Sequence, residues 1–175
     1  DRNKIDNIFF LKRIEFLKKY DSLDNVSLEQ RDCIDYVRNY GLDVFNYNFA
    51  REYDQLDIEV YYDEKIDLYY TYYNNYRMYL SRDYKKKSYI INYMRGILRE
   101  QDQRSPHYYN INNLNFNEDT VALDAGVAEG NFALDIINKV KKIYLVEADL
   151  NWCEALKYTF KPFGEKVVII QGYLG

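Results

Sequence analysis

The sequence predicts an α/β fold in which a Rossmann-like parallel sheet follows a region of helices and an antiparallel β-meander. In the C-terminal half, short apolar strands alternate with helices, and the expected segments are 120–124, 131–139, 143–147, 150–160 and 166–171. Between residues 56 and 80, apolar and polar residues instead alternate with the period of two that strands show. The glycine-containing stretch Val121–Gly130 joins the first C-terminal strand to its helix, as ligand-binding loops do in parallel sheets.

Two helices are expected before the meander. Ile5–Tyr20 carries apolar residues on one helical stripe. Ser27 and Gln30 have the spacing of a capping box, and the helix that they open is expected to end near Gly41. The N-terminal segment is therefore predicted to be helical.

Three strands and a third helix are expected next. The strands are predicted at 56–62, 66–72 and 77–80, with turns at Asp63–Lys65 and Asn74–Asn75. A helix over Asp83–Arg99 and a polar break ending in Ser-Pro-His follow. We accordingly divide the chain into an N-terminal helical and meander region, 1–105, and a Rossmann-like domain, 106–175.

The composition excludes several classes of protein. With 175 residues, 47% hydrophobic, the chain can form a globular core. Its net charge of −4 argues against non-specific nucleic-acid binding, so no nucleic-acid partner is expected. No apolar run approaches the roughly 20 residues of a transmembrane helix. Two unpatterned cysteines and one histidine predict neither a disulfide nor a metal site, and they favour a reducing, cytoplasmic location.

The 21 tyrosines have two interpretations. A carbohydrate-stacking surface is one. The other is the codon bias of an AT-rich genome, because Asn, Lys, Ile and Asp are abundant too, and tyrosines also serve as ordinary sheet and core residues. We favour the compositional interpretation.

The loop after the first parallel strand has the features of a nucleotide site. Asp124 ends the strand, and Gly126 and Gly130 allow close backbone approach and a sharp turn into the helix. Glu147 ends the next strand about 20 residues later, where an acid can accept hydrogen bonds from ribose hydroxyls. A dinucleotide loop would read Gly-x-Gly-x-x-Gly, and an acid in place of its first glycine repels pyrophosphate but suits an ammonium group.

Four segments resemble the FkbM-type methyltransferases, particularly a bacterial branch that modifies glycans. The matching segments are Glu100–Tyr109 (EQDQRSPHYY), Gly126–Phe132 (GVAEGNF), Tyr144–Trp152 (YLVEADLNW) and Ala155–Phe160 (ALKYTF). Together they cover about residues 100–172. The upstream meander also resembles the family's strand-rich region, though weakly.

The resemblance implies a class I methyltransferase fold that binds S-adenosylmethionine. The resemblance implies that Asp124, Gly126 and Gly130 shape the methionine end and that Glu129, Asn131 and Phe132 line the loop. It also implies that Glu147 holds the ribose and that Ala148 and Asp149 lie close to the adenine. The segment before the first parallel strand often closes over the methionine end in this fold. Its residues are candidates for cofactor or acceptor contact, and they are Glu100, Gln101, Ser105 and His107.

Two of these positions keep a structural alternative. His107 is the only histidine and the one weak candidate for a general base, but Ser-Pro-His equally fits a simple turn. Trp152 is expected to pack its helix rather than stack on adenine.

The family's domain continues through several more strands, which carry acceptor-binding residues, whereas this sequence ends at Gly175. We therefore expect an incomplete, C-terminally truncated sheet whose exposed edge favours a homodimer. This argues against catalysis by these 175 residues alone.

The leading function is O-methylation of a sugar hydroxyl in a bacterial glycan, with S-adenosylmethionine as the cofactor. The acceptor class rests on the resemblance alone. A lipid or small-metabolite methyltransferase is one alternative, and a non-catalytic scaffold or oligomerisation module is another. A dehydrogenase ranks last because the glycine spacing is wrong.

Overall fold

The computed structural model describes residues 2–20 and 25–174. The chain divides into two compact units, Asp1–Leu56 and Asp57–Gly175. The first contains α1 (Arg2–Tyr20), α2 (Leu28–Tyr40) and the 3-10 helix η1 (Asn48–Tyr53). Over the described residues, no helix is both long and apolar enough to cross a membrane.

The predicted ends of α2 are confirmed. The Ser27 hydroxyl accepts a hydrogen bond from the Gln30 backbone N–H at 3.1 Å, and the Ser27 N–H donates to the Gln30 side chain at 2.8 Å. Gly41 follows the helix with φ of 95°, and its N–H donates to the Val37 carbonyl at 3.1 Å. Both ends of the helix thus satisfy backbone groups that would otherwise lack partners.

The second unit begins with the antiparallel meander β1 (Tyr61–Asp63), β2 (Leu68–Tyr73) and β3 (Tyr76–Tyr79). Asn74 and Asn75 form the second turn with φ of 48° and 67°, a conformation that asparagine tolerates well. β1 is shorter than predicted. The Thr71 hydroxyl donates to the Glu59 carbonyl at 2.9 Å and so uses an acceptor that a longer ladder would need.

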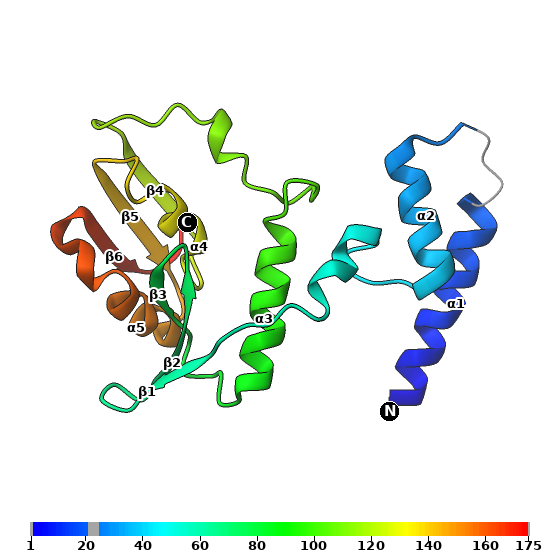
Figure 1. The fold of residues 1–175 in the computed structure, drawn as a ribbon, viewed down its shortest axis with the longest axis horizontal. Helices are drawn as coiled ribbons and strands as arrows, with labels where there is room; N and C mark the ends of the chain where they lie inside the picture. Colours follow the sequence, from blue (N-terminus) through cyan, green and yellow to red (C-terminus); the bar gives the residue numbers. More distant parts are fainter. Residues whose placement is uncertain (1, 21–24, 175) are drawn as a thin grey trace. The chain divides into compact units, whose positions relative to one another are not determined.

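Helix α3 (Lys87–Glu100) follows, starting a few residues later than predicted. A turn at Ser81–Tyr84 accounts for the delay, since the Tyr84 N–H donates to the Ser81 carbonyl at 3.0 Å. The connection to the next strand contains one short helical turn, η2 (Ile111–Asn113), visible in Figure 1.

The C-terminal half forms the predicted parallel sheet. Its elements are β4 (Val121–Ala125), α4 (Asn131–Ile136), β5 (Lys142–Glu147), α5 (Leu150–Thr159), η3 (Lys161–Lys166) and β6 (Val167–Gln171). The strand order is β4-β5-β6, all parallel, and Figure 1 shows the three strands side by side. A mixed α/β fold with a three-stranded parallel, Rossmann-like sheet is therefore confirmed.

One core joins the meander, α3 and the parallel sheet. Ile143 of β5 and Leu156 of α5 are fully buried in the same cluster as Met78 of β3 and Ile90 of α3. Residues 57–105 consequently belong to the same compact unit as the sheet, and the structural division lies at 56/57, whereas the sequence pattern placed it at 105/106. The change in sequence pattern at 105 marks a change of sheet type within one unit.

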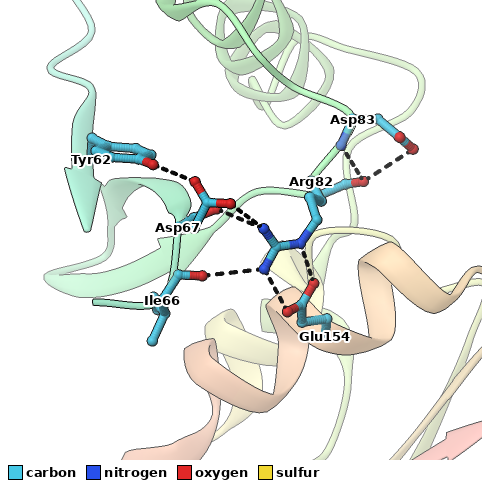
Figure 2. Close-up of polar contacts among 7 residues, drawn as sticks. Tyr62, Ile66, Asp67, Arg82, Asp83 and Glu154 are labelled. Atoms are coloured by element: carbon cyan, nitrogen blue, oxygen red, sulfur yellow. Dashed lines mark hydrogen bonds and ion pairs between the residues drawn. The ribbon is translucent and has the colours of Figure 1, made fainter. Parts of the chain in front are cut away.

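Arg82 connects the meander to α5 (Figure 2). Its Nε and Nη2 donate to the Glu154 carboxylate at 2.8 and 2.7 Å, and Nη1 donates to Asp67 at 2.6 Å. Nη2 also donates to the Ile66 carbonyl at 3.2 Å. One planar guanidinium therefore fixes the β1–β2 turn against the helix.

The face of the parallel sheet opposite its helix-covered face carries exposed apolar side chains among the described residues. Val121 and Leu123 of β4 are each 57% exposed, and Ile170 of β6 is 43% exposed. These side chains alternate with the buried ones on the helix-covered face, so the exposure follows from the strand period.

Candidate functional site

The candidate site lies at the carboxyl ends of β4 and β5, where open parallel sheets bind ligands. Asp124 pairs with Leu145 across these strands, and the Gly126 N–H continues the ladder by donating to the Val146 carbonyl at 2.9 Å. The chain then turns through residues 126–130 into α4. The loop is thereby anchored at the strand end where the sequence predicts it.

The loop between β4 and α4 depends on left-handed backbone at three positions, Gly126, Ala128 and Gly130, with φ of 76°, 47° and 83°. A Cβ on Gly126 would meet nothing within 4 Å, so the backbone there is open to a ligand. A Cβ on Gly130 would lie 2.7 Å from a Phe160 ring carbon and 3.0 Å from a Leu156 methyl carbon. The first glycine thus leaves a ligand face clear, and the second allows the loop to pack on α5.

Glu147 holds the loop from the neighbouring strand. Its Oε2 accepts a hydrogen bond from the Ala128 N–H at 2.9 Å, and its Oε1 accepts one from the Asp149 N–H at 2.8 Å. The residue is only 8% exposed. Each carboxylate oxygen keeps a second lone pair for a further donor such as a ribose hydroxyl. That ribose contact stays a prediction.

Carboxyl groups concentrate at this strand end. The Asp124 carboxylate is half-buried, accepts no hydrogen bond from any described residue, and has its pKa raised by burial. Glu129 is 4% exposed, and burial raises its pKa, with the charges of Glu100 and Asp124 adding to the effect. Two buried acids whose charged forms are disfavoured by burial are the complement of a cationic ligand.

Tyr93 of α3 reaches the loop and donates a hydrogen bond from its hydroxyl to the Glu129 carboxylate. Its ring lies 5.0 Å from that of Tyr84 and 6.0 Å from that of Trp152, between centroids. Trp152 therefore packs within this aromatic group, as expected for a helix-packing residue. Sequence reasoning missed Tyr93, because its helical stripe predicts only packing.

The segment before β4 contacts the loop through an aromatic pair. The Tyr109 and Phe132 rings meet edge to face with centroids 5.2 Å apart. The Tyr109 N–H donates to the Gln101 side chain at 3.2 Å, which ties the segment to the end of α3. Burial raises the pKa of the Tyr109 hydroxyl, with Asp124 a further cause. Tyr109 is thus a second site residue that the candidate list omitted.

Ser105 and His107 form a turn beside this segment. Ser105 is 6% exposed, and its hydroxyl accepts the His107 N–H at 3.1 Å, while the His107 side chain is exposed. These contacts agree with the structural alternative for Ser-Pro-His. A cofactor or acceptor contact by either residue stays a prediction.

The remaining predicted residues have local partners of their own. Asp149 caps α5 by accepting the Asn151 and Trp152 N–H groups at 2.8 and 3.0 Å. Asn131 is buried at the start of α4, and Ala148 is exposed next to Glu147. The loop and the two strand ends therefore bring together Asp124, Gly126, Glu129, Gly130, Phe132, Glu147, Ala148 and Asp149.

Comparisons with known proteins place no family name on the chain. No protein-family model matches it, and no curated protein matches it. Among solved structures, it is similar to the M. jannaschii tRNA m1G37 methyltransferase, with 21% identity, a TM-score of 0.37, and coverage of 60% of this chain and 30% of that one. For Trm5b from Pyrococcus abyssi the values are 19%, 0.35, 60% and 28%.

A third similar structure is the precorrin 8w decarboxylase of Methanobacterium thermoautotrophicum, with 19% identity, a TM-score of 0.30, and coverage of 33% of this chain and 32% of that one. The chain thus spans about a third or less of each of these proteins. TM-scores of 0.30 to 0.37 are too low to define the fold. The fold class therefore rests on the parallel strand order β4-β5-β6 and on the loop between β4 and α4.

Proposed function

We propose that the carboxyl ends of β4 and β5 bind S-adenosylmethionine and that the chain is the cofactor-binding part of a methyltransferase. The observation that carries this proposal is the Asp124 carboxylate, half-buried without a described hydrogen-bond donor and beside the open backbone of Gly126. The ammonium of the methionine moiety would supply both a donor and the opposite charge. A pyrophosphate would be repelled at the same place.

The residues of the crevice fit this ligand. Gly126 leaves its ligand face free of side chains, and the buried Glu129 adds negative charge opposite a sulfonium. Glu147 retains acceptor capacity for the ribose, and the exposed Ala148 leaves space beside it for adenine. The Phe132–Tyr109 pair would cover the methionine end and exclude water.

Little further chemistry is required of the protein. The bound cofactor supplies an already activated methyl group on its sulfonium. The loop residues orient that group, and the segment 100–109 shields it from water. Removal of the hydroxyl proton needs a base, and His107 is kept as the candidate because it lies in this same segment.

The acceptor that we propose is a sugar hydroxyl of a bacterial glycan. Support for it comes from the sequence resemblance over about residues 100–172, which includes the segment before β4 as well as the cofactor loop. A lipid or small metabolite with a free hydroxyl group is the alternative acceptor.

Titration of S-adenosylhomocysteine by calorimetry tests the cofactor proposal. We expect micromolar binding, no binding of NAD, and a loss of about tenfold in Asp124→Asn, since a charge-assisted hydrogen bond is replaced by a neutral one. Asp119→Asn is the matched control, because Asp119 is an exposed acid that ion-pairs with Lys141 outside the crevice. Equal affinities in the two variants, or binding of NAD alone, would refute the proposal.

A second candidate function is a non-catalytic oligomerisation module. The exposed apolar face of the parallel sheet, with Val121, Leu123 and Ile170, favours it, because such a face is stabilised by a second copy. Sedimentation velocity separates the candidates: a dimer that Leu123→Glu dissociates, together with no S-adenosylhomocysteine binding, would support the module. A monomer that binds the ligand would exclude it.

A further inference from the structure

Two surface pockets of the second unit differ in how their arginine side chains are paired. One has a volume of about 380 Å³ and includes Arg82, whose guanidinium is occupied by Glu154, Asp67 and the Ile66 carbonyl (Figure 2). The other, which we call the tyrosine pocket, has a volume of about 500 Å³. It is lined chiefly by Tyr72, Tyr76, Tyr79, Tyr158, Arg77 and Lys161.

The cations of the tyrosine pocket are not neutralised. No described carboxylate lies within ion-pair distance of Arg77 or Lys161. The Arg77 guanidinium lies 5.0 Å from the centroid of the Tyr70 ring, and the neighbouring Tyr72 and Tyr79 side chains raise its pKa. Unlike Arg82, this arginine has no ion pair with a described carboxylate and keeps its charge available for an anion, although the neighbouring Tyr79 hydroxyl donates to the Asp63 carboxylate at 3.1 Å.

The walls of the tyrosine pocket are fixed by contacts between elements. The Tyr79 N–H donates to the Thr159 hydroxyl at 2.9 Å, which joins β3 to the end of α5. Asn138 donates to the Tyr76 hydroxyl at 2.8 Å, and the Tyr79 and Tyr158 rings lie 5.8 Å apart. A site whose side chains are already held in place costs little ordering entropy on binding.

Position separates this pocket from the proposed cofactor crevice. α5 begins beside Glu147 at Leu150, and the pocket lies at its other end, at Thr159 and Lys161. A helix of 10 residues is about 15 Å long, so a group in the pocket does not reach the crevice.

We propose that the tyrosine pocket binds an acidic sugar residue. The exposed Tyr72 ring offers a flat apolar surface for the C–H face of a sugar, the phenol hydroxyls and Asn75 offer hydrogen bonds to its hydroxyls, and Arg77 with Lys161 matches its carboxylate. A nucleic-acid strand would need a row of cations along its phosphates, whereas this pocket has two in a chain of net charge −4.

This inference stands independently of methyl transfer, and one experiment tests it. Trigalacturonate is titrated into the full chain by calorimetry, with maltotriose as the neutral probe and oligouridylate as the nucleic-acid probe. We expect saturable binding of trigalacturonate alone, about tenfold weaker in Arg77→Gln and about fivefold weaker in Tyr72→Ala.

Two matched controls are Lys139→Gln and Tyr89→Ala, since both residues are exposed and lie outside the pocket. Circular dichroism confirms that each variant is folded, and S-adenosylhomocysteine affinity in Arg77→Gln should equal that of the parent chain. Absence of trigalacturonate binding at millimolar concentration, equal binding of maltotriose, equal loss in the controls, or Arg77-dependent binding of oligouridylate would each overturn the proposal.

Discussion

Gly130 is the position where the smallest perturbation should have the largest effect on the loop. Alanine there would place a Cβ 2.7 Å from one Phe160 ring carbon, 3.0 Å from another, and 3.0 Å from a Leu156 methyl carbon. Phe160 is 2% exposed and Leu156 is fully buried, so neither side chain can swing into solvent. The backbone at Gly130 is also left-handed, with φ of 83°.

Two costs add in Gly130→Ala. Holding a non-glycine residue in left-handed backbone costs about 1–2 kcal/mol. Inserting a methyl group into packed core adds about 1–3 kcal/mol. The total of about 2–5 kcal/mol corresponds to a lowering of Tm by about 4–20 °C in a chain of this size.

Gly126→Ala is the matched control, because Gly126 also has a positive φ, of 76°, but a Cβ there would meet nothing within 4 Å. It should lower Tm by only about 2–8 °C, the backbone cost alone. Thermal unfolding followed by circular dichroism measures both variants. Equal shifts would refute the packing argument and show that Phe160 moves away at no cost.

Three further predictions follow from the buried acids, the Arg82 contacts and the capping box. Burial raises the pKa of Asp124 and that of Glu129 above their ordinary values of 3.8 and 4.5, so the folded chain binds more protons than the unfolded chain and its stability should fall as pH rises through this window. Urea unfolding between about pH 4 and 7 should show a smaller fall in stability for Asp124→Asn than for the parent chain. An equal fall in both would contradict the raised pKa of Asp124. Arg82→Lys should cost about 1 kcal/mol in urea unfolding, since lysine keeps the charge but loses the forked contact with the partly exposed Glu154, and no change would mean that the contact is not stabilising. Ser27→Ala should reduce the stability of α2 by about 1 kcal/mol, measurable by native-state hydrogen exchange at the helix start, whereas Ser27→Asp should retain it.

The sequence predicted those features that depend on residues close together in the chain. The Ser27 box and the end of α2 at Gly41 involve neighbours within a turn, and the structure has both. The alternation of apolar strands with helices predicted the parallel sheet, because each strand end carries its own signal, such as Asp124 or Glu147. Local signals thus sufficed for the order of elements and for the position of the loop.

Features that depend on contacts between distant segments were not predicted. Tyr93 lies 36 positions before Glu129, and nothing in its own helix distinguishes it from a packing residue. The late start of β1 at Tyr61 depends on the Thr71 hydroxyl, which reaches the Glu59 carbonyl 12 positions away. Asp149 shows the reverse limit, since the sequence predicts it near adenine, whereas in the structure its carboxylate caps α5.

The boundary of the folding unit provides the last test, since the sequence pattern and the structure divide the chain differently. Met78, Leu80, Ile90 and Met94 are at most 2% exposed and share one core with the helices of the parallel sheet. Each such side chain contributes about 1.5–3 kcal/mol on burial, so the four together contribute about 6–12 kcal/mol. This is comparable to the roughly 5–15 kcal/mol by which a domain is stable. A chain starting at Asp57 should therefore unfold cooperatively and keep its affinity for S-adenosylhomocysteine, whereas one starting at Pro106 should show no cooperative transition. Cooperative unfolding of the shorter chain would instead support a boundary at 105/106 and reduce the meander to an appendage of an independent parallel sheet.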